Sequence, residues 1–307
     1  MDKINVTKPL NTAELKWQQE RDRRVEVFKE TVRVATDGAY INSKGEKVEI
    51  PNKYDDLPLD SVTFYDSDIS KKINFDKLKR YKTEITVVND DCLKVAEQLV
   101  KDGYTPAVIN FASFTTPGGG VIKGSRAQEE NICRRTNLFE SIFRFRVDLA
   151  KDYALPVEEK QYPLPVNHGA IYSPSITVFR ASDNENYKFL DEPFGIDVIT
   201  IAALKHPELD SKGHMSAWAK SITKQKIRTM LNLGIYWEND SLVLGAFGCG
   251  AFANPPEDVA TLFKEVLNEP EYKDKFDKLV FAVLDDGNSH KEHNPRGNYL
   301  PFKEILG

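Results

Sequence analysis

The stretch that decides the fold covers residues 108–138 and reads VINFASFTTPGGGVIKGSRAQEENICRRTNL. It begins with an apolar strand at residues 108–111, and regular structure then breaks at Pro117 and three glycines. Consecutive glycines tolerate positive φ and have no Cβ to obstruct a ligand that approaches the main chain. Apolar residues at helical spacing predict one long helix over residues 125–150. A glycine loop that leads into a helix start offers amide donors and a favourable dipole to a phosphate.

The start of this helix carries further signals. Ser125 and Gln128 have capping-box spacing, so we expect Ser125 to cap the helix and Gln128 to reach back to it. Glu129 and Glu130 follow in the first turns, where adjacent side chains point about 100° apart and cannot do the same job. Like charges held together raise the pKa of one group, which suits a general acid. Acidic residues also favour helix N-termini for purely structural reasons, so this alternative stays open.

Two familiar phosphate-binding motifs do not fit this segment. A P-loop has a lysine after its last glycine, whereas Ser125 follows Gly124 here. The dinucleotide fingerprint G-x-G-x-x-G is also missing from the segment. The glycines alone therefore leave open a loop that only turns tightly.

A second strand–glycine–helix turn follows at residues 241–263, SLVLGAFGCGAFANPPEDVATLF. We expect the helix after it to begin with Asn254 as N-cap and a proline at the first helical position. Two such loops in one sheet can close over the two phosphates of a diphosphate. Phe252 is predicted either to pack on a ribose or base, or to be a core aromatic. Cys249 has no obvious histidine partner, which argues against a nucleophile.

The wider chain predicts an α/β fold. Strands alternate with helices after residue 84, which indicates a sheet with helices on both faces. We therefore expect an N-terminal accessory region, residues 1–83, packed on a catalytic domain, residues 84–307. Within the accessory region the sequence predicts a helix at residues 12–34 with Thr12 as cap, a hairpin at 39–50 and an irregular segment at 51–80.

Composition limits the classes of partner. A formal net charge of -5 does not indicate sequence-specific nucleic-acid binding. Three separated cysteines and a polar N-terminus predict a reducing, intracellular location, cytoplasmic or nuclear. No apolar run is long enough to cross a bilayer. His290 and His293 stand in a polar stretch that we expect to be a solvated loop rather than a metal site. We expect a monomer.

Together, these segments resemble the microbial-type poly(ADP-ribose) glycohydrolases, which have a macrodomain core. The family signature is three glycines, a short spacer and Gln-Glu-Glu, and here Gly118 to Gly120 are followed by seven residues and then Gln128 to Glu130. The motifs NFAS, YSPSITVF, DVIT, LGAFGCGAFANPP and VFAVLDD match in the same order, over nearly the whole chain. The resemblance implies a three-layer α/β/α macrodomain-like mixed sheet with a helical N-terminal extension. The segment IAALKHP departs from the family pattern and puts contacts near residues 205–207 in doubt.

The resemblance also implies an activity and roles for residues. The activity is hydrolysis of ribose–ribose O-glycosidic bonds from the termini of poly(ADP-ribose), which releases ADP-ribose and uses no metal or cofactor. Glu130 would protonate the leaving ribose oxygen and then deprotonate the attacking water, while Glu129 would hold the ribose hydroxyls. Asp91 matches a position that contacts adenine, and Asn110 would order the loop or a ribose. The other expected substrate contacts are Gly118, Gly119, Gly120, Gln128, Gly248, Cys249, Gly250, Ala251 and Phe252.

Three other functions would use the same pocket. A non-catalytic ADP-ribose-binding module would keep both glycine loops but has no need of Glu130. A hydrolase that removes single ADP-ribose units from protein side chains would have the same ligand pocket, and the sequence does not separate the two substrates. A phosphatase acting on an ADP-ribose phosphate is the least favoured. The expected partner is therefore an ADP-ribose polymer or an ADP-ribosylated protein.

Overall fold

The computed structural model describes residues 11–50, 62–285, 287 and 289–307. The main-sheet strands are β3 (Thr63–Tyr65), β4 (Glu84–Val88), β5 (Pro106–Phe111), β6 (Ala170–Arg180), β7 (Phe189–Ile201), β8 (Ser241–Leu244) and β9 (Lys278–Ala282). In these residues they form one seven-stranded mixed sheet in the order β3-β6-β7-β5-β8-β9-β4. The predicted hairpin is present as β1 (Ala39–Ile41) and β2 (Lys47–Glu49).

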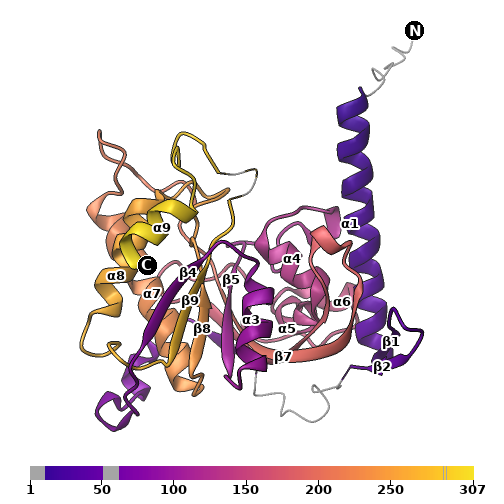
Figure 1. The fold of residues 1–307 in the computed structure, drawn as a ribbon, viewed down its shortest axis with the longest axis horizontal. Coiled ribbons are helices and arrows are strands. Elements are labelled where there is room, and N and C mark those ends of the chain that lie inside the picture. The colour runs from indigo at the N-terminus through magenta and orange to yellow at the C-terminus, as the bar shows by residue number, and fades with distance from the viewer. Residues whose placement is uncertain (1–10, 51–61, 286, 288) are drawn as a thin grey trace.

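Helices cover both faces of the sheet (Figure 1). The α-helices are α1 (Thr12–Asp37), α3 (Cys92–Lys101), α4 (Gln128–Arg135), α5 (Leu138–Ile142), α6 (Val147–Asp152), α7 (Ala217–Tyr236), α8 (Pro256–Leu267) and α9 (Tyr299–Leu306). Short 3-10 turns include η2 (Ile69–Lys72), η3 (Phe75–Lys77), η4 (Val121–Lys123) and η5 (Phe143–Phe145). Among the described residues, no helix combines the length and the apolar character needed to span a bilayer.

The central strand β5 separates two hydrophobic cores, one on each face of the sheet. It lies between β7 and β8 and runs parallel to both, so it is buried on both faces. Ala107 and Ile109 face a core formed with α7, α8 and α9, whereas Val108 faces a second core formed with α3, α4 and α5. This alternation gives the predicted three-layer α/β/α arrangement.

The N-terminal helix α1 packs on the second core and extends beyond it (Figure 1). Its cap is Asn11, in a capping box with Glu14, and not Thr12 as the sequence suggested. Phe28 contacts Phe139, with ring centroids 5.7 Å apart. The proposed boundary at residue 84 stays a prediction, although β3 from the region before it pairs antiparallel with β6.

Two predicted elements were wrong. The long helix at 125–150 is instead three α-helices, α4, α5 and α6. Thr136 takes an extended conformation and forms a bridge with Val178, which separates α4 from α5, and η5 with the extended Arg146 separates α5 from α6. This tertiary pairing overrides a helical pattern. The segment predicted to be irregular contains β3, η2 and η3, and its residues 51–61 lie outside the described part of the chain.

Candidate active site

The ends of four parallel strands meet around one cavity of about 240 Å³, called here the first cavity. Its walls come from the segments after β4, β5, β8 and β9, which is where ligands bind in open α/β sheets. The predicted residues that line it are Asp91, Gln128, Gly248, Gly250, Ala251 and Phe252. Others were missed by the sequence reasoning, namely Phe111, Arg126, Asn131, Leu284 and Asn298.

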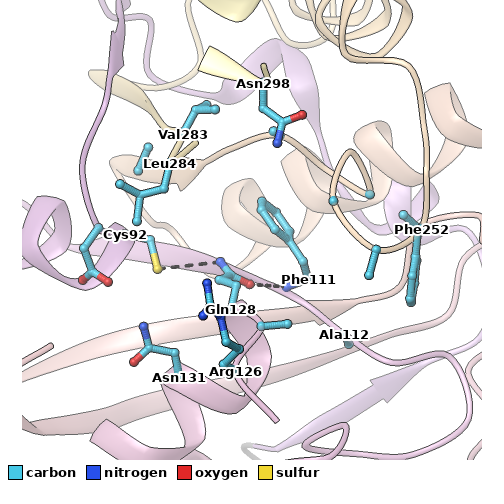
Figure 2. A pocket seen from close by; sticks show the side chains of 18 of the residues that line it. Cys92, Phe111, Ala112, Arg126, Gln128, Asn131, Phe252, Val283, Leu284 and Asn298 are labelled. Carbon is cyan, nitrogen blue, oxygen red and sulfur yellow. Dashed lines mark hydrogen bonds between the residues drawn. The ribbon is translucent and has the colours of Figure 1, made fainter. Parts of the chain in front are cut away.

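The predicted capping box, with Ser125 as the cap and Gln128 reaching back to it, is wrong. Helix α4 begins at Gln128 with Ala127 as its N-cap residue, and no side chain caps it. The Gln128 side chain instead accepts a hydrogen bond from the Phe111 amide at 2.7 Å and donates one to the Ile109 carbonyl at 2.8 Å. Figure 2 shows it between Cys92 and Phe111, with Phe252 beyond. Gln128 thus fixes α4 against the end of β5.

Glu129 is bound on both oxygens by the main chain. Its Oε2 accepts from the Ser113 amide at 2.7 Å and its Oε1 from the Gly118 amide at 2.9 Å. The residue is 2% exposed, and burial raises the pKa of its carboxyl to about 8, with the nearby Glu130 adding in the same direction. The side chain therefore holds the first glycine loop to the helix. Its expected role of holding ribose hydroxyls stays a prediction.

Glu130 is bound on one oxygen only. Its Oε1 accepts from the Gly120 amide at 2.8 Å, whereas its buried Oε2 has no hydrogen-bond partner among the described residues. A buried polar atom without a partner is costly and calls for an explanation such as a catalytic role. The anchored oxygen fixes the carboxyl. Glu130 does not line the first cavity, and proton exchange between its other oxygen and a ligand stays a prediction.

The first glycine loop needs its glycines because neighbouring side chains, the two carboxyl groups among them, fill the space around it. Gly118 and Gly119 have φ of 72° and 57°, values that residues with a Cβ rarely adopt. A Cβ on Gly119 would lie 2.5 Å from Oε1 of Glu130 and 3.0 Å from Oε2 of Glu129. A Cβ on Gly120 would collide with the Ser125 hydroxyl. The loop and the two glutamates are therefore one unit.

Neutral groups hold the second glycine loop. Asn254 was expected to be the N-cap of α8, but Pro255 occupies that position and α8 begins at Pro256. The Asn254 amide instead donates to the carbonyls of Leu204 at 2.7 Å and Gly248 at 3.0 Å. A Cβ on Gly248, which has φ of 76°, would lie 2.5 Å from this amide nitrogen.

Cys249 and His293 belong to the support of this loop. Cys249 is buried, and burial raises the pKa of its thiol well above the ordinary range, which disfavours a reactive thiolate. Its carbonyl oxygen lies 2.8 Å from Nε2 of His293, so this histidine is not simply solvated as expected. In the described ranges, no three His, Cys, Asp or Glu side chains gather in a geometry suited to a metal ion.

Asp91 and Asn110 occupy different positions in the site. Asp91 lines the first cavity, caps α3 through the amides of residues 93 and 94, and accepts from Nη1 of Arg135 at 2.7 Å. Asn110 is fully buried in β5, where its Nδ2 donates to Thr200 at 3.1 Å. The assigned contacts of both residues with ligand stay predictions.

A second cavity of about 340 Å³ adjoins the first, and Ala203 and Phe252 line both. Its wall also contains Lys205, a position whose contacts with substrate the sequence left in doubt. The remaining lining residues were not expected from the sequence, namely Ser113, Phe114, Thr115, Val166, Leu204, Trp218 and Lys226. The one sequence signal for Lys226 is its position beside apolar residues of a predicted helix, such as Ile227 and Met230.

Comparisons with known proteins agree with this geometry. A family model for the catalytic domain of microbial-type PARG, poly(ADP-ribose) glycohydrolase, matches residues 28–181, half of the chain. No curated protein matches. A crystal structure of the Thermomonospora curvata poly(ADP-ribose) glycohydrolase with the inhibitor ADP-HPD is 25% identical, covers 92% of this chain and 99% of its own, and has a TM-score of 0.72.

A second similar structure is the poly(ADP-ribose) glycohydrolase from Deinococcus radiodurans in complex with ADP-ribose. It is 25% identical, covers 84% of this chain and 98% of its own, and has a TM-score of 0.63. The fold, with its seven-stranded mixed sheet, is macrodomain-like as in these structures. The chain belongs to the family of microbial-type poly(ADP-ribose) glycohydrolase catalytic domains.

Proposed function

We propose that the chain hydrolyses the ribose–ribose O-glycosidic bonds of poly(ADP-ribose) and releases ADP-ribose from chain ends, with Glu130 as the general acid and base. The observation that carries this proposal is the asymmetry of Glu130, which has one oxygen anchored on Gly120 and the other buried without a partner. A binding module has no need of such a carboxyl. The family and the ligands of the two similar structures support the same activity.

The first cavity is the expected site of the terminal ADP-ribose unit. The second glycine loop lines it through Gly248 and Gly250, and Phe252 offers an aromatic face at one side. In this arrangement the diphosphate would lie against the second glycine loop, because Gly118 to Gly120 do not line this cavity, and Asp91, after β4, would meet the adenine. The distal ribose would lie near Phe252, where the first and second cavities meet.

Departure of the leaving ribose builds oxocarbenium character at the anomeric carbon. Glu130 would give its proton to the 2′-oxygen of the leaving unit as the glycosidic bond breaks. The resulting carboxylate would then take a proton from a water molecule that attacks the anomeric carbon. Glu129 does not supply a second catalytic carboxylate in this scheme, because both of its oxygens hold main-chain amides.

The experiment that tests the function supplies labelled poly(ADP-ribose) and mono-ADP-ribosylated protein in separate reactions and identifies the products. We expect free ADP-ribose to be released from the polymer. Release of longer oligomers would contradict action at chain ends. Cleavage of the mono-modified protein without cleavage of polymer would overturn the polymer assignment.

A further inference from the structure

The second cavity contains a buried, unpaired amine. Lys226 lies on α7, is 1% exposed and lines this cavity. Its Nζ has no hydrogen-bond partner among the described residues. Burial of an ammonium group without a counter-charge is unfavourable, so such a position is uncommon unless a ligand compensates it. The amine is therefore a candidate ligand-binding group that the reaction scheme above does not use.

This cavity adjoins the place where the reaction occurs. Ser113 lines it, and the Ser113 amide is bound by the carboxylate of Glu129. The same Glu129 carboxylate and that of Glu130 both approach Gly119. Phe252 forms a wall shared by both cavities. A group that leaves from the distal ribose at Phe252 would therefore enter the second cavity.

The chemistry of the wall fits a nucleotide. The buried side chain of Lys226 lines the cavity and brings a positive charge to its wall, and the exposed Lys205 adds a second cation. Trp218 lines the same space with 57% of its surface exposed, and such a ring can stack on a base. Burial lowers the pKa of Lys226 to about 8, so the amine is still mostly protonated near neutral pH. No carboxylate lines this cavity among the described residues, so an anion meets no like charge on its wall.

We propose that the second cavity binds the ADP-ribose unit on the leaving-group side of the scissile bond, with Lys226 on its phosphate and Trp218 against its base. This proposal rests on the proposed polymer hydrolysis. It adds that the enzyme recognises two consecutive units of its substrate, of which the second is recognised through its phosphate.

The test compares Lys226→Met with wild type on two substrates. One is poly(ADP-ribose), and the other is an aryl ADP-ribose, in which 4-nitrophenol replaces the next unit and carries no phosphate. We expect KM for polymer to rise about tenfold to 100-fold, as for the loss of a charged hydrogen bond, with kcat nearly unchanged. Both constants for the aryl substrate should stay at their wild-type values. Lys226→Arg should restore part of the polymer affinity.

Lys224→Met is the matched control, because Lys224 lies on the same helix but pairs with Glu265 at 2.6 Å. It should leave both substrates unaffected. If Lys226→Met fails to fold, Trp218→Ala removes an exposed ring of the same subsite and should also raise KM for polymer alone. Equal changes for both substrates, or none for either, would overturn the subsite. Failure of the wild-type enzyme to cleave polymer while it cleaves the aryl substrate would instead overturn the proposed function.

Discussion

Both glycine loops are held in place by hydrogen bonds with buried side chains, but these side chains differ in chemistry. The first, around Gly118 to Gly120, is held by the carboxylates of Glu129 and Glu130. The second, around Gly248 to Gly250, is held by the neutral Asn254 amide and by contacts of Cys249 with His293. An ionisable group that supports a loop can also exchange a proton, whereas an amide cannot. His293 at the second loop is also ionisable, but its ring nitrogen meets a main-chain carbonyl, whereas Glu130 at the first loop keeps one oxygen without a partner among the described residues. The comparison therefore favours the first loop as the place of the proposed chemistry.

The largest effect should come from Glu130→Gln. The amide can still accept from the Gly120 amide through its oxygen, but it has no proton to transfer. Because general acid–base catalysis contributes about 10²–10⁴-fold, kcat for polymer should fall by that amount. Asn254→Ala is the comparison in the second loop, and it should leave kcat far less affected. Steady-state assays of both variants would separate the loops, and equal losses would remove the distinction between them.

Alanine at Gly119 and at Gly248 should break the loops in different ways. A Cβ at Gly248 meets the Ala203 Cβ at 2.6 Å as well as Asn254, so Gly248→Ala should cost about 2–4 kcal/mol of stability from overpacking and strain. A Cβ at Gly119 meets the movable Glu130 carboxylate, so Gly119→Ala should lower turnover more than stability. Gly38→Ala controls for positive φ alone, because nothing lies within 4 Å of its Cβ. Chemical unfolding and polymer assays of the three variants are the measurements.

Glu129→Gln should lose stability where Glu130→Gln does not. Above about pH 8, where the Glu129 carboxyl is ionised and accepts on both oxygens, the amide of the variant can offer an acceptor to only one of the Ser113 and Gly118 amides. This leaves a buried donor unsatisfied at a cost of about 1–3 kcal/mol. Urea unfolding of the two variants side by side gives the comparison. Equal stability of Glu129→Gln and wild type would show that the carboxylate does not hold the loop.

The pH dependence of the unfolding free energy should include a contribution from Glu129. Its pKa is raised from an ordinary 4.5 to about 8 in the folded protein, so the folded state binds this proton more tightly. The unfolding free energy should therefore fall as pH rises from about 4.5 through about 8. Glu140, with a pKa raised to about 7 by burial, adds in the same direction. Unfolding curves at pH 5 and pH 8 should differ less for Glu129→Gln than for wild type, and an unchanged difference would contradict the assignment.

The smallest expected effect is that of chelation. The proposed reaction uses carboxyl chemistry alone, so EDTA should leave the polymer hydrolysis rate unchanged. A loss of activity in EDTA that magnesium or zinc restores would show that the reaction needs a metal ion and would contradict the proposed mechanism.

The sequence predicted the elements that local rules control. The buried strand at residues 108–111 and the two glycine turns were recognised because apolar runs and glycines act locally. It failed where distant contacts decide. Thr136 leaves the helix to pair with Val178, and Asn254 turns from capping to hold Gly248.

For the site as well, the sequence indicated residues that form a contiguous motif and missed residues that only the fold brings together. That the two glutamates lie against the first glycine loop could be predicted because these residues form a contiguous motif, whereas their roles toward a ligand stay predictions. Lys226 and Trp218 were not found, because they reach the site only through the packing of α7 against the sheet.

The central claim is that the unpaired oxygen of Glu130 carries the transferable proton. The most direct measurement is made on one folded sample of Glu130→Gln, first titrated calorimetrically with ADP-ribose and then mixed with polymer under single-turnover conditions. We predict an affinity close to that of wild type and a rate constant lower by at least about 100-fold. A wild-type rate constant at wild-type affinity would contradict the account and place the chemistry elsewhere.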